Sequence, residues 1–144
     1  MLTDLGYFKL SVFKELTAKG AYFLSKLLLG TTLLNADTSE KIDLRATLRS
    51  FVGNTLEMNV IMGNDKHPVP CRLIGFRATK QIADTRRRKL RKEAKKKGRT
   101  PSKNHLALCD WTLFVTNAPS EMLPVTIVFS LYRLRWQIEL IFKQ

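Results

Sequence analysis

The segment TLEMNVIMGNDKHPVPCRLIGFRA, residues 55–78, carries the clearest fold signal in this sequence. Its first eight residues place apolar side chains at every second position, which is the pattern of a strand with one buried face. The residues GNDKHP that follow are typical of a turn, and the apolar alternation resumes after them. The segment therefore predicts a β-hairpin. The residues expected on its buried face are Leu56, Met58, Val60, Met62, Val69, Cys71 and Leu73.

Immediately before the hairpin, the segment SEKIDLRATLRSF predicts a short helix. Ser39 stands where a helix cap is expected, because its hydroxyl can accept a hydrogen bond from a backbone N–H of the first turn. Leu44, Leu48 and Phe51 are the residues that such a helix would turn inward. With the hairpin after it, the block from about Thr31 to Ala78 is predicted to be mainly β.

The two ends of the chain indicate a mixed α/β architecture. DLGYFKLSVFKELTAKG, residues 4–20, predicts a strand-to-helix junction in which Gly6 makes the turn and Gly20 ends the helix. AYFLSKLLL, residues 21–29, predicts a largely buried strand, and the segment LALCDWTLFVTN predicts another. After a connector, a helix that begins near Pro124 is expected to run to the last residue. We therefore predict the α/β class.

One segment accounts for most of the charge. The 144 residues include 25 Lys and Arg against 12 Asp and Glu, a net charge of +13, and RRRKLRKEAKKKGR, residues 86–99, holds ten of those cations. Helix-forming residues dominate it up to Gly98, so we expect an exposed basic helix or an arm that orders on binding. Contact with nucleic-acid phosphates is the favoured role, and a solvated segment that keeps the protein soluble is the alternative. The candidate DNA-binding residues are Arg86, Arg87, Arg88, Lys89, Arg91, Lys92, Lys95, Lys96, Lys97 and Arg99.

Several other classes of protein are disfavoured. The longest apolar segment, AYFLSKLLLG, contains Lys26 and is too short to cross a bilayer, so a membrane partner is not expected. The start MLTDLGYF lacks the basic and apolar regions of a secretory signal. Cys71 and Cys109 lie far apart, and His67 and His105 have no neighbours with the spacing of metal ligands. This cysteine usage fits a cytoplasmic protein better than a zinc or disulfide scaffold.

The last fourteen residues, LYRLRWQIELIFKQ, combine ionisable and apolar side chains in one expected helix. On a helical wheel with about 100° per residue and Tyr132 at zero, Arg135 lies at about −60° and Glu139 at about −20°, so these three residues share one face. An Arg and a Glu four residues apart can simply form a surface ion pair worth a few tenths of a kcal/mol. The apolar residues expected in the adjacent, buried sector are Ile127, Leu131, Leu134, Ile138, Ile141 and Phe142.

A second carboxylate gives the ionisable face another interpretation. Asp4 stands at the expected end of a strand, where open α/β sheets place ligands, although a single Asp often only caps a helix or forms a turn. Carboxylates from separate elements can share Mg²⁺, which prefers oxygen ligands and phosphate. Asp4 and Glu139 are therefore candidate catalytic and metal-binding residues.

The sequence resembles bacterial insertion-sequence DDE transposases of the type-four family. YRLRWQIELIFKQ matches their Tyr-x2-Arg-x3-Glu-x6-Lys signature through Tyr132, Arg135 and Glu139, and WTLFVTNAP resembles the segment that leads into it. DLGYF resembles the segment that carries the second catalytic aspartate, here Asp4. The resemblance implies a partial ribonuclease H-like fold with three parts. These are residues 1–30 with Asp4, a β-rich insert at 31–105 with the basic segment 86–99, and a strand and catalytic helix at 106–144.

The resemblance also implies a role for each signature residue. Asp4 and Glu139 would be ligands of Mg²⁺, with Mn²⁺ as a substitute. Tyr132 and Arg135 would hold a phosphate near a base flipped out of the transposon end. The implied chemistry is hydrolysis at the transposon ends, followed by attack of the freed 3′-hydroxyl on target DNA. The implied partners are DNA, as transposon ends and target, and a second copy of the full-length protein.

Two residues of the family pattern are missing from this sequence. The first catalytic aspartate would precede Asp4 by a long segment, and the signature lysine would stand seven residues after Glu139, whereas Lys143 stands four residues after it. We therefore expect a truncated part of the catalytic domain that is inactive alone. A non-catalytic basic nucleic-acid-binding module is the alternative hypothesis, and a remnant without selected function is a third.

Overall fold

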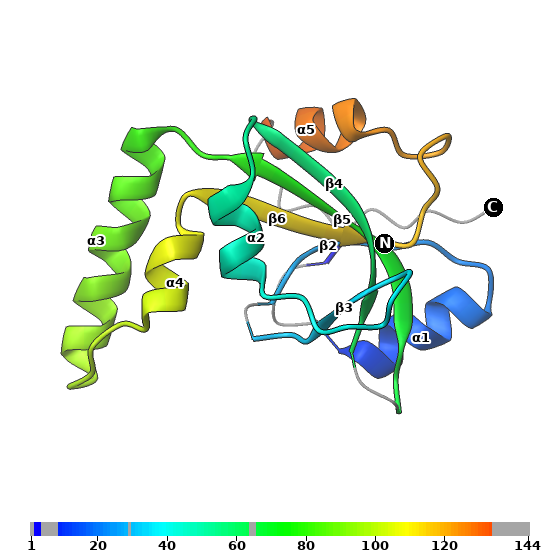
Figure 1. Cartoon of the computed structure of the whole chain (residues 1–144), viewed down its shortest axis with the longest axis horizontal. Coiled ribbons are helices and arrows are strands. Elements are labelled where there is room, and N and C mark those ends of the chain that lie inside the picture. The colour runs from blue at the N-terminus through cyan, green and yellow to red at the C-terminus, as the bar shows by residue number, and fades with distance from the viewer. Residues whose placement is uncertain (1, 4–8, 29, 64–65, 134–144) are drawn as a thin grey trace.

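One mixed sheet organises this computed structural model, which describes residues 2–3, 9–28, 30–63 and 66–133 (Figure 1). The order of the described strands is β1-β2-β6-β5-β4-β3; β1 pairs parallel with β2, and every later pair is antiparallel. The strands are β1 (Leu2–Thr3), β2 (Leu24–Lys26), β3 (Leu33–Asn35), β4 (Thr55–Met62), β5 (Val69–Arg77) and β6 (Trp111–Thr116). The helices are α1 (Leu10–Ala18), α2 (Leu44–Ser50), α3 (Lys80–Lys96), α4 (Lys103–Leu108) and α5 (Val125–Arg133). The predicted α/β class is confirmed.

Helices cover both faces of the sheet. On one face, α1 and α2 contribute Phe13 and Leu48 to a core that includes Leu56, Leu73 and Val115 of the central strands. On the other face, α5 packs on a second core formed by other residues of β2, β5 and β6. Figure 1 shows α5 above the sheet, α1 below it, and α3 extending away from the end at which β6 begins. The sheet is therefore a middle layer between two cores, and the charged helix α3 contributes no residue to either core.

The predicted hairpin is confirmed as β4 and β5, which pair from Thr55↔Phe76 to Met62↔Val69. All seven residues expected on its buried face belong to the first core, with Met58 half-buried at its margin. Gly63 leaves β4 with a φ of 106°, and a Cβ there would lie 2.4 Å from the carbonyl oxygen of His67. This position therefore requires glycine, because a side chain would collide with the returning backbone.

The helix predicted at residues 39–51 forms, but it begins later. In α2 the cap is Asp43, whose carboxylate accepts a hydrogen bond from the Ala46 N–H at 3.1 Å. The expectation that Ser39 caps the helix is wrong, because Ser39 has a φ of 61° and lies in the preceding turn. Leu48 is buried and Leu44 packs on the same core, so the predicted inward face is confirmed.

Two predicted strands are shorter than the sequence suggested. Strand β2 covers only three residues of the segment 21–29, although Phe23 and Leu27 beside it are buried. In LALCDWTLFVTN, the residues before Cys109 belong to α4, which Ser102 caps by accepting a hydrogen bond from the His105 N–H at 3.1 Å. For these first residues of the segment, the local helix cap therefore outweighs the apolar alternation.

The strands of the predicted insert join the same sheet as the strands outside it. Strand β5 pairs with β6 from Arg72↔Thr116 to Arg77↔Trp111, and β6 pairs with β2 on its other side. The predicted boundary at residue 30 falls between β2 and β3 and the one at residue 105 falls within α4, while the strands on both sides of each boundary belong to one sheet. The ribonuclease H-like arrangement stays a prediction.

Candidate nucleic-acid interface and metal-binding positions

The basic segment is a helix with clear ends. Helix α3 begins at Lys80 after Thr79, whose hydroxyl accepts a hydrogen bond from the Ile82 N–H at 3.2 Å. At its other end, the Gly98 N–H donates to the Lys95 carbonyl at 3.0 Å, and the Arg99 N–H donates to the Ala94 carbonyl at 2.8 Å. Gly98 has a φ of 65°, so this is the glycine-dependent helix ending that the sequence indicated. Of the two states expected for the segment, the structure shows the ordered helix.

The inner face of α3 attaches the helix to the start of β6. Arg86 donates to the Thr112 hydroxyl at 2.8 Å and to the Trp111 carbonyl at 3.2 Å. Arg87 donates to Asp110 and, at 3.1 Å, to Asp84. The hydrogen bond with Asp110 is the main reason that the pKa of Arg87 is raised. Arg86 and Arg87 therefore bind residues of the domain, whereas Arg88, within the described part of the chain, has only a long hydrogen bond of 3.4 Å to the Thr85 hydroxyl of its own helix.

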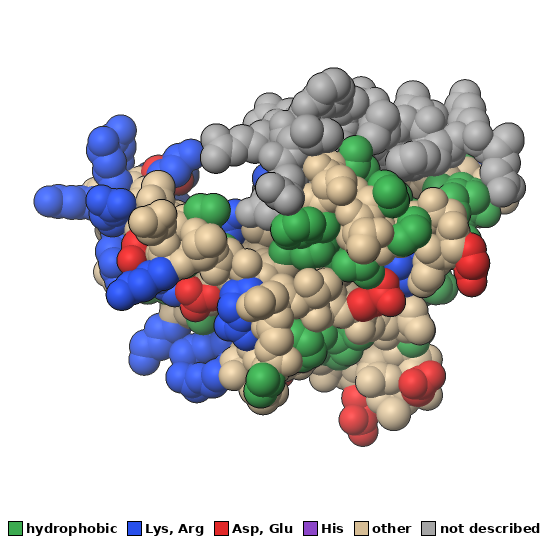
Figure 2. Space-filling view, turned by 90° about the horizontal axis from the view of Figure 1, so that it is seen from above, with side chains coloured by type: hydrophobic (Ala, Val, Ile, Leu, Met, Phe, Trp, Pro, Cys, Tyr) green, Lys and Arg blue, Asp and Glu red, His purple; other side chains and the backbone are tan. Residues whose placement is uncertain are grey.

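The outer face of α3 and its C-terminal extension present the other candidates to solvent. None of them forms an ion pair with another residue in the described part of the chain. Figure 2 shows Lys and Arg side chains gathered at the end of the molecule that α3 forms in Figure 1. Such a row of uncompensated cations attracts a polyanion. The exposed residues are Arg88, Lys89, Arg91, Lys92, Lys95, Lys96, Lys97 and Arg99.

Helix α5 turns a different face to the sheet from the one expected. Val128 is fully buried in the second core, and Val125 and Leu131 pack beside it. Ile127 was expected in the buried sector, but it is 47% exposed, so that assignment is wrong. The physical reason is that Phe76 and Phe114 form the apolar surface under the helix and receive the side that carries Val128. The inward face is therefore rotated from the predicted sector.

A buried arginine fixes the approach to α5. Arg72 of β5 is 7% exposed and donates from Nε to the Ala118 carbonyl at 2.9 Å and from Nη2 to the Leu123 carbonyl at 2.6 Å. Its Nη1 donates to Glu57 Oε2 at 2.8 Å. Because each bond satisfies a donor removed from water, the connector between β6 and α5 is tied to the sheet. The sequence pattern does not indicate this role, because Arg72 alternates with Cys71 and Leu73 and therefore stands on the face of the strand opposite to the predicted buried one.

The predicted metal-binding residues lie outside the described residues. These are Asp4 and Glu139. Arg135, predicted to hold a phosphate, also lies outside the described residues, whereas the backbone of Tyr132 belongs to α5. Strand β1 ends at Thr3, directly before Asp4, and pairs parallel with β2. Within residues 2–3, 9–28, 30–63 and 66–133, no three His, Cys, Asp or Glu side chains lie together as a metal-binding group.

The cysteines and the helices give two further findings. Cys71 and Cys109 are free, and burial raises the pKa of both thiols, that of Cys71 to about 12. Such thiols stay protonated near neutral pH and are poor nucleophiles. In the described part of the chain, every helix is too short or too polar to span a bilayer.

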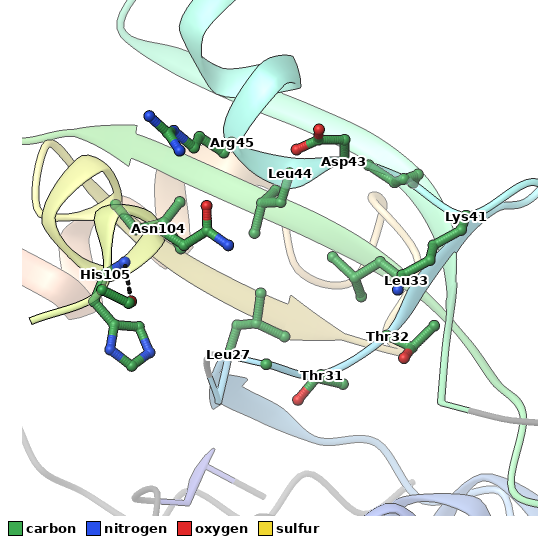
Figure 3. Close-up of a pocket in the computed structure, with 14 residues that line it drawn as sticks. Leu27, Thr31, Thr32, Leu33, Lys41, Asp43, Leu44, Arg45, Asn104 and His105 are labelled. Carbon is green, nitrogen blue, oxygen red and sulfur yellow. Dashed lines mark hydrogen bonds between the residues drawn. The ribbon is translucent and has the colours of Figure 1, made fainter.

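An open pocket of about 620 Å³ lies between α2, α4 and the segment that leads into β3 (Figure 3). Arg45 of α2 and Asn104 of α4 lie toward one end of it, and Lys41 and Thr32 lie toward the other. A second depression of about 220 Å³ shares Arg45 and Leu108 with the first. The two pockets therefore flank the contact between α2 and α4.

Comparison with known proteins identifies the family. All residues from 1 to 144 match the model of the transposase DDE domain, and the chain belongs to this family. It is 30% identical over 158 residues to the transposase for insertion sequence element IS231F of Bacillus thuringiensis subsp. israelensis, covering 99% of this chain and 33% of that protein. It is 31% identical over 158 residues to the transposase for IS1151 of Clostridium perfringens, with the same two coverages.

The chain is also similar to the putative transposase InsL for insertion sequence element IS186A of Escherichia coli (strain K12). It is 32% identical over 110 residues, covering 72% of this chain and 30% of that protein. No solved structure matches the chain. The chain thus spans about a third of the length of these curated relatives. The expected membership among insertion-sequence DDE transposases is confirmed, and the type-four signature stays a prediction.

Proposed function

We propose that this chain forms part of the catalytic domain of a DNA transposase. The reaction is Mg²⁺-dependent hydrolysis of phosphodiester bonds at transposon ends and transfer of the freed strand to target DNA. Support comes from the family membership and from relatives named as transposases of insertion sequence elements. This membership favours a transposase over a non-catalytic basic module.

The orientation of α5 is the observation that carries the proposal furthest. Val128 marks the side of this helix that faces the sheet. Positions 132, 135 and 139 follow it by four, seven and eleven residues, which is the spacing of one helix face. A helix of unbroken period would therefore turn Tyr132, Arg135 and Glu139 toward the sheet rather than along the margin of a buried face.

Asp4 and Glu139 have the chemistry that a magnesium site requires. Both are carboxylates, and Mg²⁺ prefers oxygen donors over nitrogen or sulfur. Asp4 directly follows β1, at an edge strand of the same sheet on which α5 packs. A bound Mg²⁺, or Mn²⁺ in its place, supplies positive charge that stabilises displacement at phosphorus.

The remaining roles belong to DNA binding and assembly. Tyr132 and Arg135 hold a phosphate of the transposon end, and the outer face of α3 contacts the phosphate backbone without reading its sequence. The full-length protein works in the bacterial cytoplasm as a dimer on two transposon ends. This sequence holds two of the three carboxylates of the family pattern, so we expect no appreciable turnover from this chain alone.

Isothermal titration with Mg²⁺ and with Mn²⁺ tests the metal site. Binding by the unchanged chain should be lost in Asp4→Ala and in Glu139→Ala, because each substitution removes one oxygen ligand. Glu121→Ala is the matched control, since Glu121 is an exposed carboxylate in the connector before α5. Equal metal binding by all four proteins would refute the shared site.

A nicking assay on supercoiled DNA tests the expected inactivity. The unchanged chain should give no more Mg²⁺-dependent nicking than Glu139→Ala does. Robust turnover that disappears in Glu139→Ala would confirm Glu139 as a catalytic residue and contradict the inactivity of this chain alone.

A further inference from the structure

Two arginines of α2 lie where the two pockets meet, and neither belongs to the basic helix α3. Arg45 lines both pockets and Arg49 lines the smaller one. They stand four residues apart, so they share one face of α2 with their Cβ atoms about 6 Å apart. Among the described residues, neither has a hydrogen-bonding or ion-pairing partner.

The acidic residues beside these arginines are already engaged. Asp43, in the larger pocket, caps α2 through the Ala46 N–H. Asp110, in the smaller pocket, binds Arg87 of α3. Neither carboxylate forms an ion pair with Arg45 or Arg49, and like charges four residues apart on a helix repel each other by a few tenths of a kcal/mol. A bound anion would remove this cost.

The neighbouring groups add further positive charge and hydrogen-bond donors. Arg77 lines the smaller pocket and is held in place, since it donates to the Gly53 carbonyl at 2.9 Å and lies 4.6 Å from the Trp111 ring centroid. In the larger pocket, Lys41 and Asn104 are exposed and can donate to an incoming ligand. The surface therefore offers several donors in a row instead of one closed binding cavity.

We propose that this surface, here called the α2–α4 groove, is a second contact site for a DNA phosphate backbone, with Arg45 and Arg49 as the phosphate-binding residues. The proposal rests on the proposed function, because it takes DNA as the polyanion. Figure 1 shows α4 between α3 and α2, and Asp110 of the smaller pocket binds Arg87 of α3, so the groove lies beside the basic helix. Two arginines on one helix face can each donate paired hydrogen bonds to phosphate oxygens of one DNA strand.

Fluorescence anisotropy with a labelled duplex of mixed sequence tests the groove. Binding is measured in EDTA at several salt concentrations for the unchanged chain and for Arg45→Ala/Arg49→Ala. Two lost phosphate contacts should lower the slope of log K against log salt by about 1.8 and weaken binding roughly 10- to 100-fold near 0.1 M salt. Circular dichroism should show an intact fold, because alanine favours a helix more than arginine does.

Lys14→Ala/Lys19→Ala provides the matched control, because it removes the same charge from exposed positions in α1 and at its C-cap. This control should leave the slope unchanged. The proposal is overturned if the groove variant keeps the slope of the unchanged chain, or if the control lowers it equally. Because the assay contains no metal, its failure is distinct from failure of the proposed magnesium site. If Arg88→Ala lowers the salt slope but the groove variant does not, the groove proposal is overturned while DNA binding by α3 stands.

Discussion

Helices α3 and α5 both lie against the sheet, but they depend on different kinds of interaction. Helix α3 has one fully buried residue, Ala83, and is attached at its base through Arg86 and Arg87. Helix α5 lies on an apolar core, and Arg72 fixes the connector that leads to it. The difference teaches that the charged helix is positioned by a few polar bonds and the apolar helix by packing. Each can therefore be disturbed separately.

The largest effect is expected at the buried arginine. Arg72→Met should destabilise the protein by about 3 kcal/mol, since it leaves two carbonyl groups and the Glu57 carboxylate without their donor. Urea unfolding followed by circular dichroism measures this. Glu57→Gln should cost less, because Arg72 keeps both carbonyl partners. A loss below about 1 kcal/mol in Arg72→Met would show that the connector does not depend on it.

A smaller effect should separate the two faces of α5. Val128→Ala removes two buried methyl groups and should cost about 2 kcal/mol of unfolding free energy. Ile127→Ala removes more atoms, yet it should change stability by less than about 0.5 kcal/mol, because Ile127 is 47% exposed. Denaturant unfolding of the two variants measures both values. The rotated face is contradicted if Ile127→Ala proves the more damaging substitution.

The smallest effect on stability is expected on the outer face of α3. Arg88→Ala should leave stability within about 0.5 kcal/mol but lower the salt slope of DNA binding by about 0.9, since one phosphate contact is lost. Its neighbour Arg87 is the matched control on the inner face. Arg87→Ala should cost about 1 kcal/mol through the lost bonds to Asp84 and Asp110, and should leave the salt slope unchanged. Unfolding and anisotropy measurements on both variants distinguish the two faces, and identical behaviour would contradict the division.

The features that were predicted correctly depend on neighbouring residues. The hairpin of β4 and β5 follows from an alternation with a turn between its halves, and Gly63 supplies the conformation that the turn needs. The end of α3 follows in the same way from Gly98. The cap of α2 shows where such reasoning fails, because Ser39 and Asp43 are both suitable residues and only the path of the turn selects Asp43.

Part of the candidate site could also be predicted from the sequence. The spacing of Tyr132, Arg135 and Glu139 indicated the transposase family, which the family comparison confirms, while the roles of these residues stay predictions. The pattern of the basic segment could not show that Arg86 and Arg87 face the domain, because Thr112 and Asp110 lie more than twenty residues away in the chain. The sequence pattern could not single out Arg45 and Arg49 as a binding site, for a related reason. Their lack of partners becomes visible only when the acidic residues around them are seen to be engaged.

The sequence by itself determined the hairpin, the presence and charge of α3, and the family to which the chain belongs. These features depend on side-chain period, turn residues and residue spacing, all of which are local. Only the tertiary structure decided which side of α5 is buried and that Arg72 is a buried donor to the connector. Both depend on the second core under α5, whose residues come from β2, β5, β6 and the segment that follows β6. The free energy of that contact is shared among segments that no local pattern connects.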